Sequence, residues 1–208
     1  MSDNSLYLEA IAHFEKLLAE ARASADPEAT AMTLASASSD GRVSARTVLL
    51  KDVNPDGFAF YTNTESRKGR QLAMNPQCAL LFLWKALANQ VQVKIEGEAV
   101  PVSVAEADAY FATRPYISQI GAWASLQSET LESRALLEQR VAHYRELYPE
   151  GQVPRPPHWS GYRVRPRLIE FWYGKEFRLH QRDRYEIEDG QWTRRLLYPL
   201  THWFNAGR

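Results

Sequence analysis

The chain has 208 residues, of which 45% are apolar and 12% aromatic, and its 25 basic and 25 acidic side chains cancel to zero formal charge. This composition excludes a disordered chain and any protein that binds nucleic acid through overall positive charge. The length fits one enlarged domain with a substantial hydrophobic core. The longest apolar run, Cys78 to Trp84, is far shorter than the ~20 residues of a membrane span. We therefore expect neither a nucleic-acid nor a membrane partner.

The start of the chain and its only cysteine bear on its cellular compartment. Met1 to Ser5 is acidic and polar, so no secretory signal is expected. Cys78 excludes an internal disulfide, and a cytoplasmic location fits. Cys78 also lies in an apolar run, where we expect a buried, inert thiol. The five histidines are dispersed, so no metal site is expected.

The zero net charge conceals an asymmetry along the chain. Residues 1–40 carry 7 acids and 2 bases, whereas residues 151–208 carry 11 bases and 6 acids. Such segments often pack against each other or face water, and composition alone favours this interpretation. The alternative is a local anionic ligand, which only the placement of individual residues can decide.

The predicted elements begin with an amphipathic helix over residues 6–25, where apolar residues recur every three or four positions. Strands over 31–36, 43–52 and 58–62 follow, and Asp-Gly turns between them are typical of antiparallel hairpins. The remaining elements, in chain order, are a helix at 65–74, strands at 78–84 and 91–102, helices at 104–113 and 129–148, and short strands at 162–164, 168–172, 177–182, 185–187 and 192–197.

This order of elements predicts an α+β protein built on an antiparallel sheet or barrel. We expect a single domain over residues 1–208, made of the helix at 1–25, a core at 26–199 and an extension at 200–208. The sequence has no Gly-x-Gly-x-x-Gly, no phosphate-loop lysine and no Gly-x-Ser-x-Gly motif. A Rossmann or P-loop nucleotide site and covalent hydrolytic chemistry therefore have little support.

Cations stand beside hydroxyl and amide side chains at four separate places. In the first, the period of two along a strand puts Arg46 and Lys51 on opposite faces, where they can serve two anions. In the second, Arg67 and Lys68 follow Ser66 in the first turn of a predicted helix, whose free N–H groups favour a phosphate.

The third and fourth places lie further along the chain. Tyr110 and Arg114 are four residues apart on one helical face, with Ser118 just beyond, which suits a phosphomonoester. Arg178 and His180, followed by Arg182, alternate onto one face of an expected strand. Taken singly, each place is best interpreted as ordinary surface or capping. Together, the four places favour one or two bound phosphates, held by charge-assisted hydrogen bonds.

These residues, in this order, resemble the pyridoxine (pyridoxamine) 5′-phosphate oxidase family. The resemblance runs from about residue 26 to residue 199. Its motifs are Arg46 to Lys51, Phe60 to Asn63, Ser66 to Lys68, Asn89 to Val91, Tyr110-Phe111 with Arg114-Pro115, Ser118 to Trp123, Gln127-Ser128, Trp159 with Gly161, Glu170 to Trp172, and Arg178 to His180.

The resemblance implies an FMN-binding split β-barrel with Greek-key strands and peripheral helices, which forms a homodimer with FMN at the subunit interface. The implied cofactor-binding residues are Arg46, Thr47, Val48, Leu49, Leu50, Lys51, Tyr61, Thr62, Arg67, Lys68, Gln90, Gln127, Ser128, Trp172 and Arg182. The implied substrate-binding residues are Lys51, Tyr110, Arg114, Ser118, Arg178, Leu179 and His180. Of these, Arg178 and His180 are the implied catalytic residues, against the pyridine ring.

The implied reaction oxidises the C4′ alcohol of pyridoxine 5′-phosphate, or the amine of pyridoxamine 5′-phosphate, to give pyridoxal 5′-phosphate. A hydride passes to FMN, and O2 reoxidises the flavin to give H2O2. Hydride transfer to a flavin needs neither a protein nucleophile nor a metal, which agrees with the absence of both from the sequence motifs.

Three features depart from the family pattern. The chain begins close to its first helix, without a longer basic arm; Gln181 stands where many relatives have an acid; and residues 200–208 continue past the usual end. Two alternatives also stay open. One is a related split-barrel flavin oxidase for another aromatic substrate, such as those of phenazine pathways, and the other is a non-catalytic carrier of FMN or pyridoxal phosphate.

Overall fold

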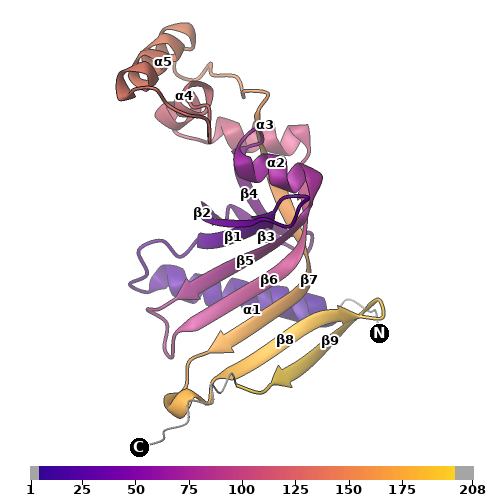
Figure 1. Ribbon diagram of the computed structural model, residues 1–208. Coiled ribbons are helices and arrows are strands. Elements are labelled where there is room, and N and C mark those ends of the chain that lie inside the picture. The colour runs from indigo at the N-terminus through magenta and orange to yellow at the C-terminus, as the bar shows by residue number, and fades with distance from the viewer. Residues whose placement is uncertain (1–4, 200–208) are drawn as a thin grey trace, which may run out of the picture.

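A computed structural model describes residues 5–199, so the expected extension at 200–208 lies outside the described residues. The strands are β1 (Ala31–Ala37), β2 (Val43–Leu49), β3 (Asp52–Asn54), β4 (Gly57–Asn63), β5 (Gln77–Trp84), β6 (Val91–Pro101), β7 (Trp159–Tyr173), β8 (Gln181–Glu188) and β9 (Gln191–Leu197). The helices are α1 (Ser5–Ala23), α2 (Arg67–Met74), α3 (Val104–Ala112), α4 (Tyr116–Ala124), α5 (Arg134–Leu147) and the 3-10 turn η1 (Glu176–Arg178). Figure 1 shows one curled sheet with α1 behind it and α3, α4 and α5 gathered beyond one end.

The nine strands form one antiparallel sheet in the order β2-β1-β5-β6-β7-β4-β3, and β8 pairs with both β7 and β9. Strand β7 organises this sheet because it is 15 residues long. Its first half pairs with β4, its second half pairs with β8, and β6 accompanies it on its other side. One strand therefore runs from the helical end of the molecule to the opposite end.

A β-bulge between Glu96 and Gly97 shifts the register of β6 against β7. A Cβ atom at Gly97 would lie 2.1 Å from the carbonyl oxygen of Arg165, so only glycine lets the two backbones approach this closely. Bulges bend a strand and increase its twist, which accounts for the curl of the sheet at this point.

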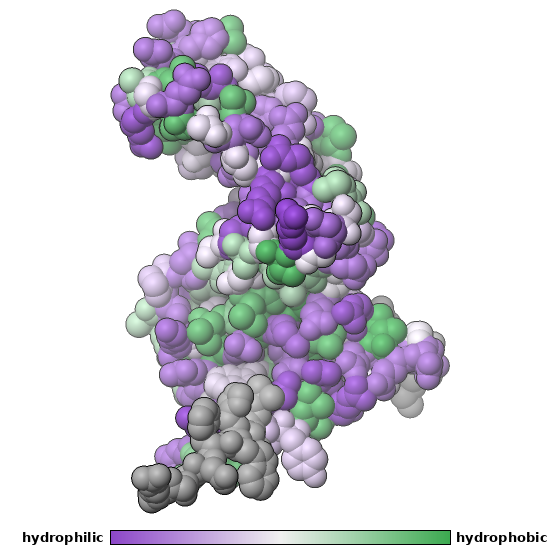
Figure 2. Space-filling view, viewed as in Figure 1, coloured by the Kyte–Doolittle hydropathy of each residue, from purple (hydrophilic) through white to green (hydrophobic). Residues whose placement is uncertain are grey.

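Helix α1 closes one face of the sheet and forms the core with it. Phe14 of α1 is fully buried, and its ring makes edge-to-face contacts with Phe58 and Phe82. No helix of residues 5–199 covers the other face of the sheet, and Figure 2 shows green, apolar side chains on this face. Leu83, whose neighbours Phe82 and Trp84 point into the core, is 45% exposed there.

Several elements differ from the expected ones. The strands expected at 162–164 and 168–172 are one strand, because Pro166 lies beside the bulge, where its missing N–H breaks no regular ladder. The strand expected at 43–52 ends at Leu49, and β3 begins at Asp52. Helix α4 was not expected, because its residues 116–124 were interpreted only as part of a motif.

The strand expected at 177–182 was wrong as well. Residues 176–178 form η1, with Phe177 and Arg178 at φ of 55° and 59°, and β8 begins only at Gln181. The chain needs this tight turn because β8 must reverse direction to pair with β7. The alternation of Arg178, His180 and Arg182 on one strand face is therefore incorrect.

No helix among residues 5–199 is long and apolar enough to span a membrane.

Candidate active site

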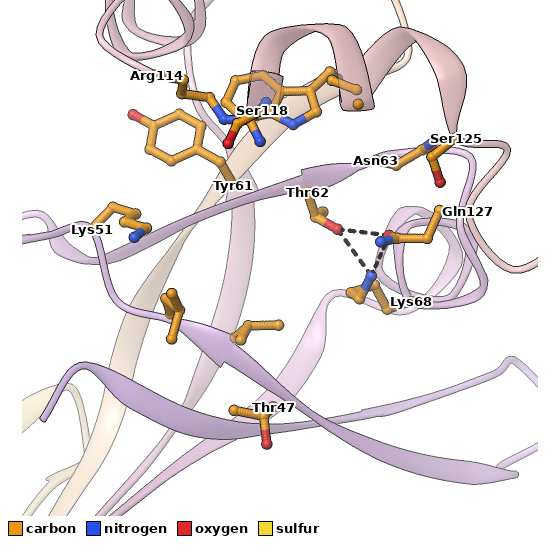
Figure 3. A pocket seen from close by; sticks show the side chains of 15 residues that line it. Thr47, Lys51, Tyr61, Thr62, Asn63, Lys68, Arg114, Ser118, Ser125 and Gln127 are labelled. Carbon is orange, nitrogen blue, oxygen red and sulfur yellow. Dashed lines mark hydrogen bonds between the residues drawn. The ribbon is translucent and has the colours of Figure 1, made fainter. Parts of the chain in front are cut away.

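A cavity of about 450 Å³ lies where the sheet meets the helical end of the molecule. Figure 3 shows Lys68, Thr62 and Gln127 on one side of it and Arg114 and Ser118 on another. Its lining residues are Thr47, Val48, Leu49, Lys51, Tyr61, Thr62, Asn63, Lys68, Arg114, Ser118, Gly121, Ala122, Ser125, Gln127 and Trp159.

Lys68 provides the positive charge on the first side of the cavity. Its Nζ atom lies 2.7 Å from Gln127 Oε1 and 3.0 Å from Thr62 Oγ1, both neutral acceptors. Helix α2 positions it, because the Ser66 side chain caps this helix by accepting from the Gly69 N–H. Burial and the nearby Arg46 charge lower the pKa of Lys68 from 10.5 to about 8. The lowered pKa indicates a cation that lacks its counter-charge.

Arg46 and Arg67 extend the positive charge beside Lys68. Arg46 donates to Ser36 Oγ at 2.7 Å and to Ser44 Oγ at 2.5 Å, again to neutral groups. Burial lowers the pKa of Arg46, and the Arg67 charge lowers it further. The backbone N–H of Arg67 donates to Ser128 Oγ at 3.1 Å, which brings the two expected residues together.

Arg114 provides the charge on the second side of the cavity. Its guanidinium carbon lies 4.7 Å from the centroid of the Trp159 ring. Its Nη1 atom is buried and has no hydrogen-bond partner. Within residues 5–199, every other buried side-chain nitrogen or oxygen has one. Tyr61 and Tyr110 stack at 4.0 Å between ring centroids, and Tyr61 also stacks on Trp159. A buried donor without a partner beside an aromatic wall suits an anionic ligand that carries a ring.

These cations also differ from the other basic residues in their salt bridges. Within the described part of the chain, Arg46, Lys68 and Arg114 have no carboxylate within 4.0 Å. Most arginines of β7, β8 and β9, by contrast, form a salt bridge at this distance. Lys51, which lines the cavity, has none either. Uncompensated positive charge in a cavity indicates that its ligand is an anion.

A second group of expected residues lies at the far end of the sheet. Trp172 is thirteen residues beyond Trp159 on β7, which corresponds to roughly 40 Å of strand. The His180 ring packs on Trp172 at 4.6 Å between centroids. Trp172 and Arg182 are cross-strand partners. Gln90 and the segment at 178–180 lie at the same end, because Gln90 accepts from the Gly174 N–H after β7.

The expected site residues thus fall into two groups. Thr47, Val48, Leu49, Lys51, Tyr61, Thr62, Lys68, Arg114, Ser118 and Gln127 line the cavity, and Arg46, Arg67, Tyr110 and Ser128 adjoin it. Gln90, Trp172, Arg178, Leu179, His180 and Arg182 lie at the far end. The Leu50 side chain is 2% exposed and belongs to the core.

Strained backbone marks both groups. Six non-glycine residues of the described chain have positive φ: Asn89, Gln90, Ser128, Phe177, Arg178 and Asp189. All but Asp189 lie in or beside the expected site segments. Such conformations are uncommon for residues with side chains and gather at functional sites.

The structure also answers how Arg182 is held next to Gln181, which is exposed. Arg182 Nε donates to Glu170 Oε1 at 2.8 Å, so the acid comes from the neighbouring strand.

Other cavity residues were not expected, namely Asn63, Gly121, Ala122, Ser125 and Trp159. All but Ser125 belong to the quoted motifs, and that was the signal that could have identified them. Within residues 5–199 there is no cluster of three His, Cys, Asp or Glu side chains that could hold a metal ion.

Comparisons with known proteins agree with this architecture. The family model described as pyridoxamine 5′-phosphate oxidase matches residues 18–148, and the model of the pyridoxine 5′-phosphate oxidase C-terminal dimerisation region matches residues 159–199. The chain is 55% identical over 196 residues to a pyridoxine/pyridoxamine 5′-phosphate oxidase of Xanthomonas euvesicatoria, covering 93% of this chain and 98% of that protein. It is 53% identical over 199 residues to the protein of the same name from Sphingopyxis alaskensis, covering 96% and 89%.

Two solved structures are similar in fold. PhzG from Burkholderia lata, in complex with tetrahydrophenazine-1-carboxylic acid, superposes with a TM-score of 0.84 at 34% identity, covering 91% of this chain and 92% of that one. A pyridoxamine 5′-phosphate oxidase-related, FMN binding protein from Nostoc punctiforme gives a TM-score of 0.66 at 15% identity, covering 96% and 99%, a likeness of fold alone.

Fold and site define a split-barrel protein of the α+β class with a cavity lined by Lys51, Lys68 and Arg114, which confirms the expected fold class. The family models and the relatives make the assignment specific. The chain belongs to the pyridoxamine 5′-phosphate oxidase family.

Proposed function

We propose that the chain oxidises pyridoxine 5′-phosphate or pyridoxamine 5′-phosphate to pyridoxal 5′-phosphate, with FMN as cofactor and O2 as final acceptor. The names of relatives more than 50% identical over nearly the whole chain support this activity. The observation that carries the proposal is the presence of two separate, uncompensated cationic groups at one cavity, around Lys68 and around Arg114. One anionic ligand does not need both groups, whereas a phosphorylated cofactor and a phosphorylated substrate do.

The first group fits FMN. Arg46, Arg67 and Lys68 would hold its phosphate, with Ser128 and Gln127 beside them. The Arg46 and Lys68 side chains donate to neutral acceptors in the chain itself, and the backbone N–H of Arg67 donates to Ser128. When bound, the flavin accepts a hydride from the substrate and passes the electrons to O2.

The second group fits the phosphate of the substrate. Arg114 has a buried donor without a partner, Ser118 lies beside it, and Lys51 lines the same cavity. The stacked rings of Tyr61 and Tyr110 would exclude water and orient the pyridine ring. These residues bind and position the substrate, and none of them needs to act as a nucleophile.

A homodimer completes the site in this proposal. Residues 178–182 lie beyond the far end of β7, too far from the cavity of their own chain to reach it. A second copy would therefore supply them, with FMN between the copies. Support comes from the match of the dimerisation-region model to residues 159–199 and from the apolar sheet face that no helix of the described chain covers. The proposed unit is one domain, because a single sheet joins β1 to β9. The single cysteine supports a cytoplasmic location.

The proposed catalytic residues are Arg178 and His180. His180 packs on Trp172, and its Nδ1 atom is 3.2 Å from the Lys175 backbone N–H, which fixes the ring. The two side chains would hold the substrate ring, and the Arg178 charge favours the negative charge that develops on the acceptor.

One experiment tests the activity. The purified protein should be yellow, and pyridoxine 5′-phosphate added without oxygen should bleach the flavin absorbance. Admission of air should restore the absorbance and yield peroxide together with the aldehyde. A bound flavin that stays oxidised with both phosphorylated vitamins would refute the proposal and leave a related flavin oxidase for another substrate or a non-catalytic carrier.

The likeness to PhzG supports a second candidate, an oxidase of reduced tricyclic carboxylic acids. The two candidates differ in the ligand of Arg114, which is a phosphate in the first. Inorganic phosphate should therefore compete with the substrate of a vitamin phosphate oxidase. Bleaching by a dihydrophenazine carboxylic acid, with no bleaching by either vitamin phosphate, would select the second candidate.

A further inference from the structure

A buried carboxylate lies among cations on the face of the sheet that α1 does not cover. Glu170 of β7 is in register with Lys94 of β6 on one side and Arg184 of β8 on the other. It is two residues before Trp172, so both side chains lie on the same face of the strand. Glu170 is 5% exposed, which makes it one of the few buried acids of the described chain.

Each oxygen of Glu170 binds a different arginine. Oε1 accepts from Arg182 Nε at 2.8 Å and lies 2.7 Å from Arg182 Nη2. Oε2 accepts from Arg184 Nε at 3.1 Å and from Arg184 Nη2 at 2.8 Å, and Lys94 Nζ is 3.8 Å away. Burial raises the pKa of Glu170, but the hydrogen bonds from both arginines outweigh burial and lower it overall. The group is therefore a carboxylate at neutral pH.

This geometry fixes the orientation of the Arg182 side chain. With Nε and Nη2 both on Oε1, the guanidinium plane is set, and Nη1 is left to meet the Tyr198 carbonyl at 3.3 Å. A long, flexible side chain held in this way loses little further entropy when it binds a ligand. Arg184 also forms a salt bridge with Glu186 on its own strand, so both Glu170 and Glu186 hold its side chain.

We propose that Glu170 is a positioning residue, which sets Arg182 in the orientation that binds the flavin. This inference rests on the proposed function, which places Arg182 beside FMN. Glu170 itself does not contact the cofactor or the substrate. Its carboxylate balances the charge of Arg182 and fixes its plane before the cofactor arrives.

The test measures FMN binding to apo-protein by fluorescence quenching, without any turnover. Glu170→Gln keeps the size of the side chain and removes its charge, and should raise the dissociation constant about tenfold. The matched control is Glu186→Gln, because Glu186 pairs with Arg184 and Arg195 but not with Arg182. It should change the constant by less than about twofold.

A double-mutant cycle separates positioning from general structure. In an Arg182→Ala background, Glu170→Gln should have less than about a twofold further effect, because the residue it acts through is gone. An equal effect of Glu170→Gln in both backgrounds, or equal effects of Glu170→Gln and Glu186→Gln, would overturn the proposal. If Glu170→Gln does not fold, Glu170→Asp replaces it, since it keeps the charge but shortens the reach, and should show the same dependence on Arg182. Wild-type protein that binds no FMN would instead contradict the proposed function.

Discussion

The surroundings of Lys68 indicate which kind of ligand the cavity suits. Its ammonium group is surrounded by Thr62, Gln127 and Ser66 oxygens, all neutral, with Arg46 close enough to repel it. Because the pKa of Lys68 falls from 10.5 to about 8, the charged ammonium lowers the free energy of unfolding of the apo-protein below pH 8. This destabilisation disappears as the pH rises from 8 towards 10.5. A bound dianion removes the destabilisation at neutral pH.

The lowered pKa predicts that flavin affinity depends on pH. Below pH 8 Lys68 is already charged, so the FMN dissociation constant should be nearly constant down to about pH 7. Above pH 8 binding must take up a proton, so the constant should rise by roughly tenfold per pH unit. Fluorescence titration of apo-protein with FMN between about pH 7 and 9.5 measures this dependence.

Lys68→Arg is the matched control, because a guanidinium stays protonated over the whole range. In this variant the affinity should vary little with pH. A wild-type profile as flat as that of the variant would show that Lys68 does not titrate at the site.

At the scale of elements, β6 and β7 decide the shape of the sheet. The bulge at Gly97 depends on a backbone approach that a Cβ atom would block, at 2.1 Å from the Arg165 carbonyl oxygen. The neighbouring carbonyl carbon and the Cα of Pro166 would both lie at 2.9 Å, so backbone rather than a movable side chain surrounds the position. The bend is therefore encoded by one residue.

Gly97→Ala should lower the free energy of unfolding by about 1–3 kcal/mol, because the strands must separate to admit the methyl group. Urea unfolding of the apo-protein measures the loss. Gly121→Ala is the control, since Gly121 lies in α4 and a Cβ there meets nothing within 4 Å. The control should be neutral or gain up to about 1 kcal/mol through helix propensity. Equal stabilities of the two variants would contradict the role of the bulge.

At the scale of the whole molecule, β7 separates the two groups of expected site residues. The cavity with Arg114 lies at one end of this strand, and His180 lies beyond the other end. The zero net charge of the chain hides this arrangement, because the cations of the cavity are balanced by acids elsewhere. A working site then requires two copies in the proposed dimer.

Two inactive variants should complement each other. Arg114→Ala damages the cavity half, and His180→Ala damages the other half, so each homodimer should lose turnover but keep flavin. After mixed refolding, half of the dimers are heterodimers with one intact site of two, so activity should return to about a quarter of wild type. The coupled appearance of aldehyde and peroxide measures the recovery.

A mixture of Arg114→Ala with Lys51→Ala is the control, because both changes fall in the cavity half and no dimer has an intact site. No recovery in the first mixture, with heterodimers shown to form, would contradict the two-copy site. Loss of flavin from His180→Ala at unchanged folded content would contradict its assignment to turnover.

Much of the fold and of the cavity could be predicted from sequence patterns. The hairpins before β4, the core side of α1 and the helix start at Ser66 follow from turn residues and periodicity, which act over a few residues. The alternation expected to place Arg46 and Lys51 on opposite faces of one strand does not extend to Lys51, because β2 ends at Leu49. The strand at 177–182 could not be predicted correctly, because the positive φ values of the turn are set by pairing between β7 and β8.

The sequence by itself thus determined the residue types of the site and the α+β class, since both depend on local composition and spacing. Only the tertiary structure decided that Arg182 is held by Glu170. These two residues are twelve apart in sequence and lie on neighbouring strands. It also decided that His180 and Arg114 lie at opposite ends of the sheet. The physical reason is that strand length and pairing register set these distances, and neither is recorded in the local pattern of side chains.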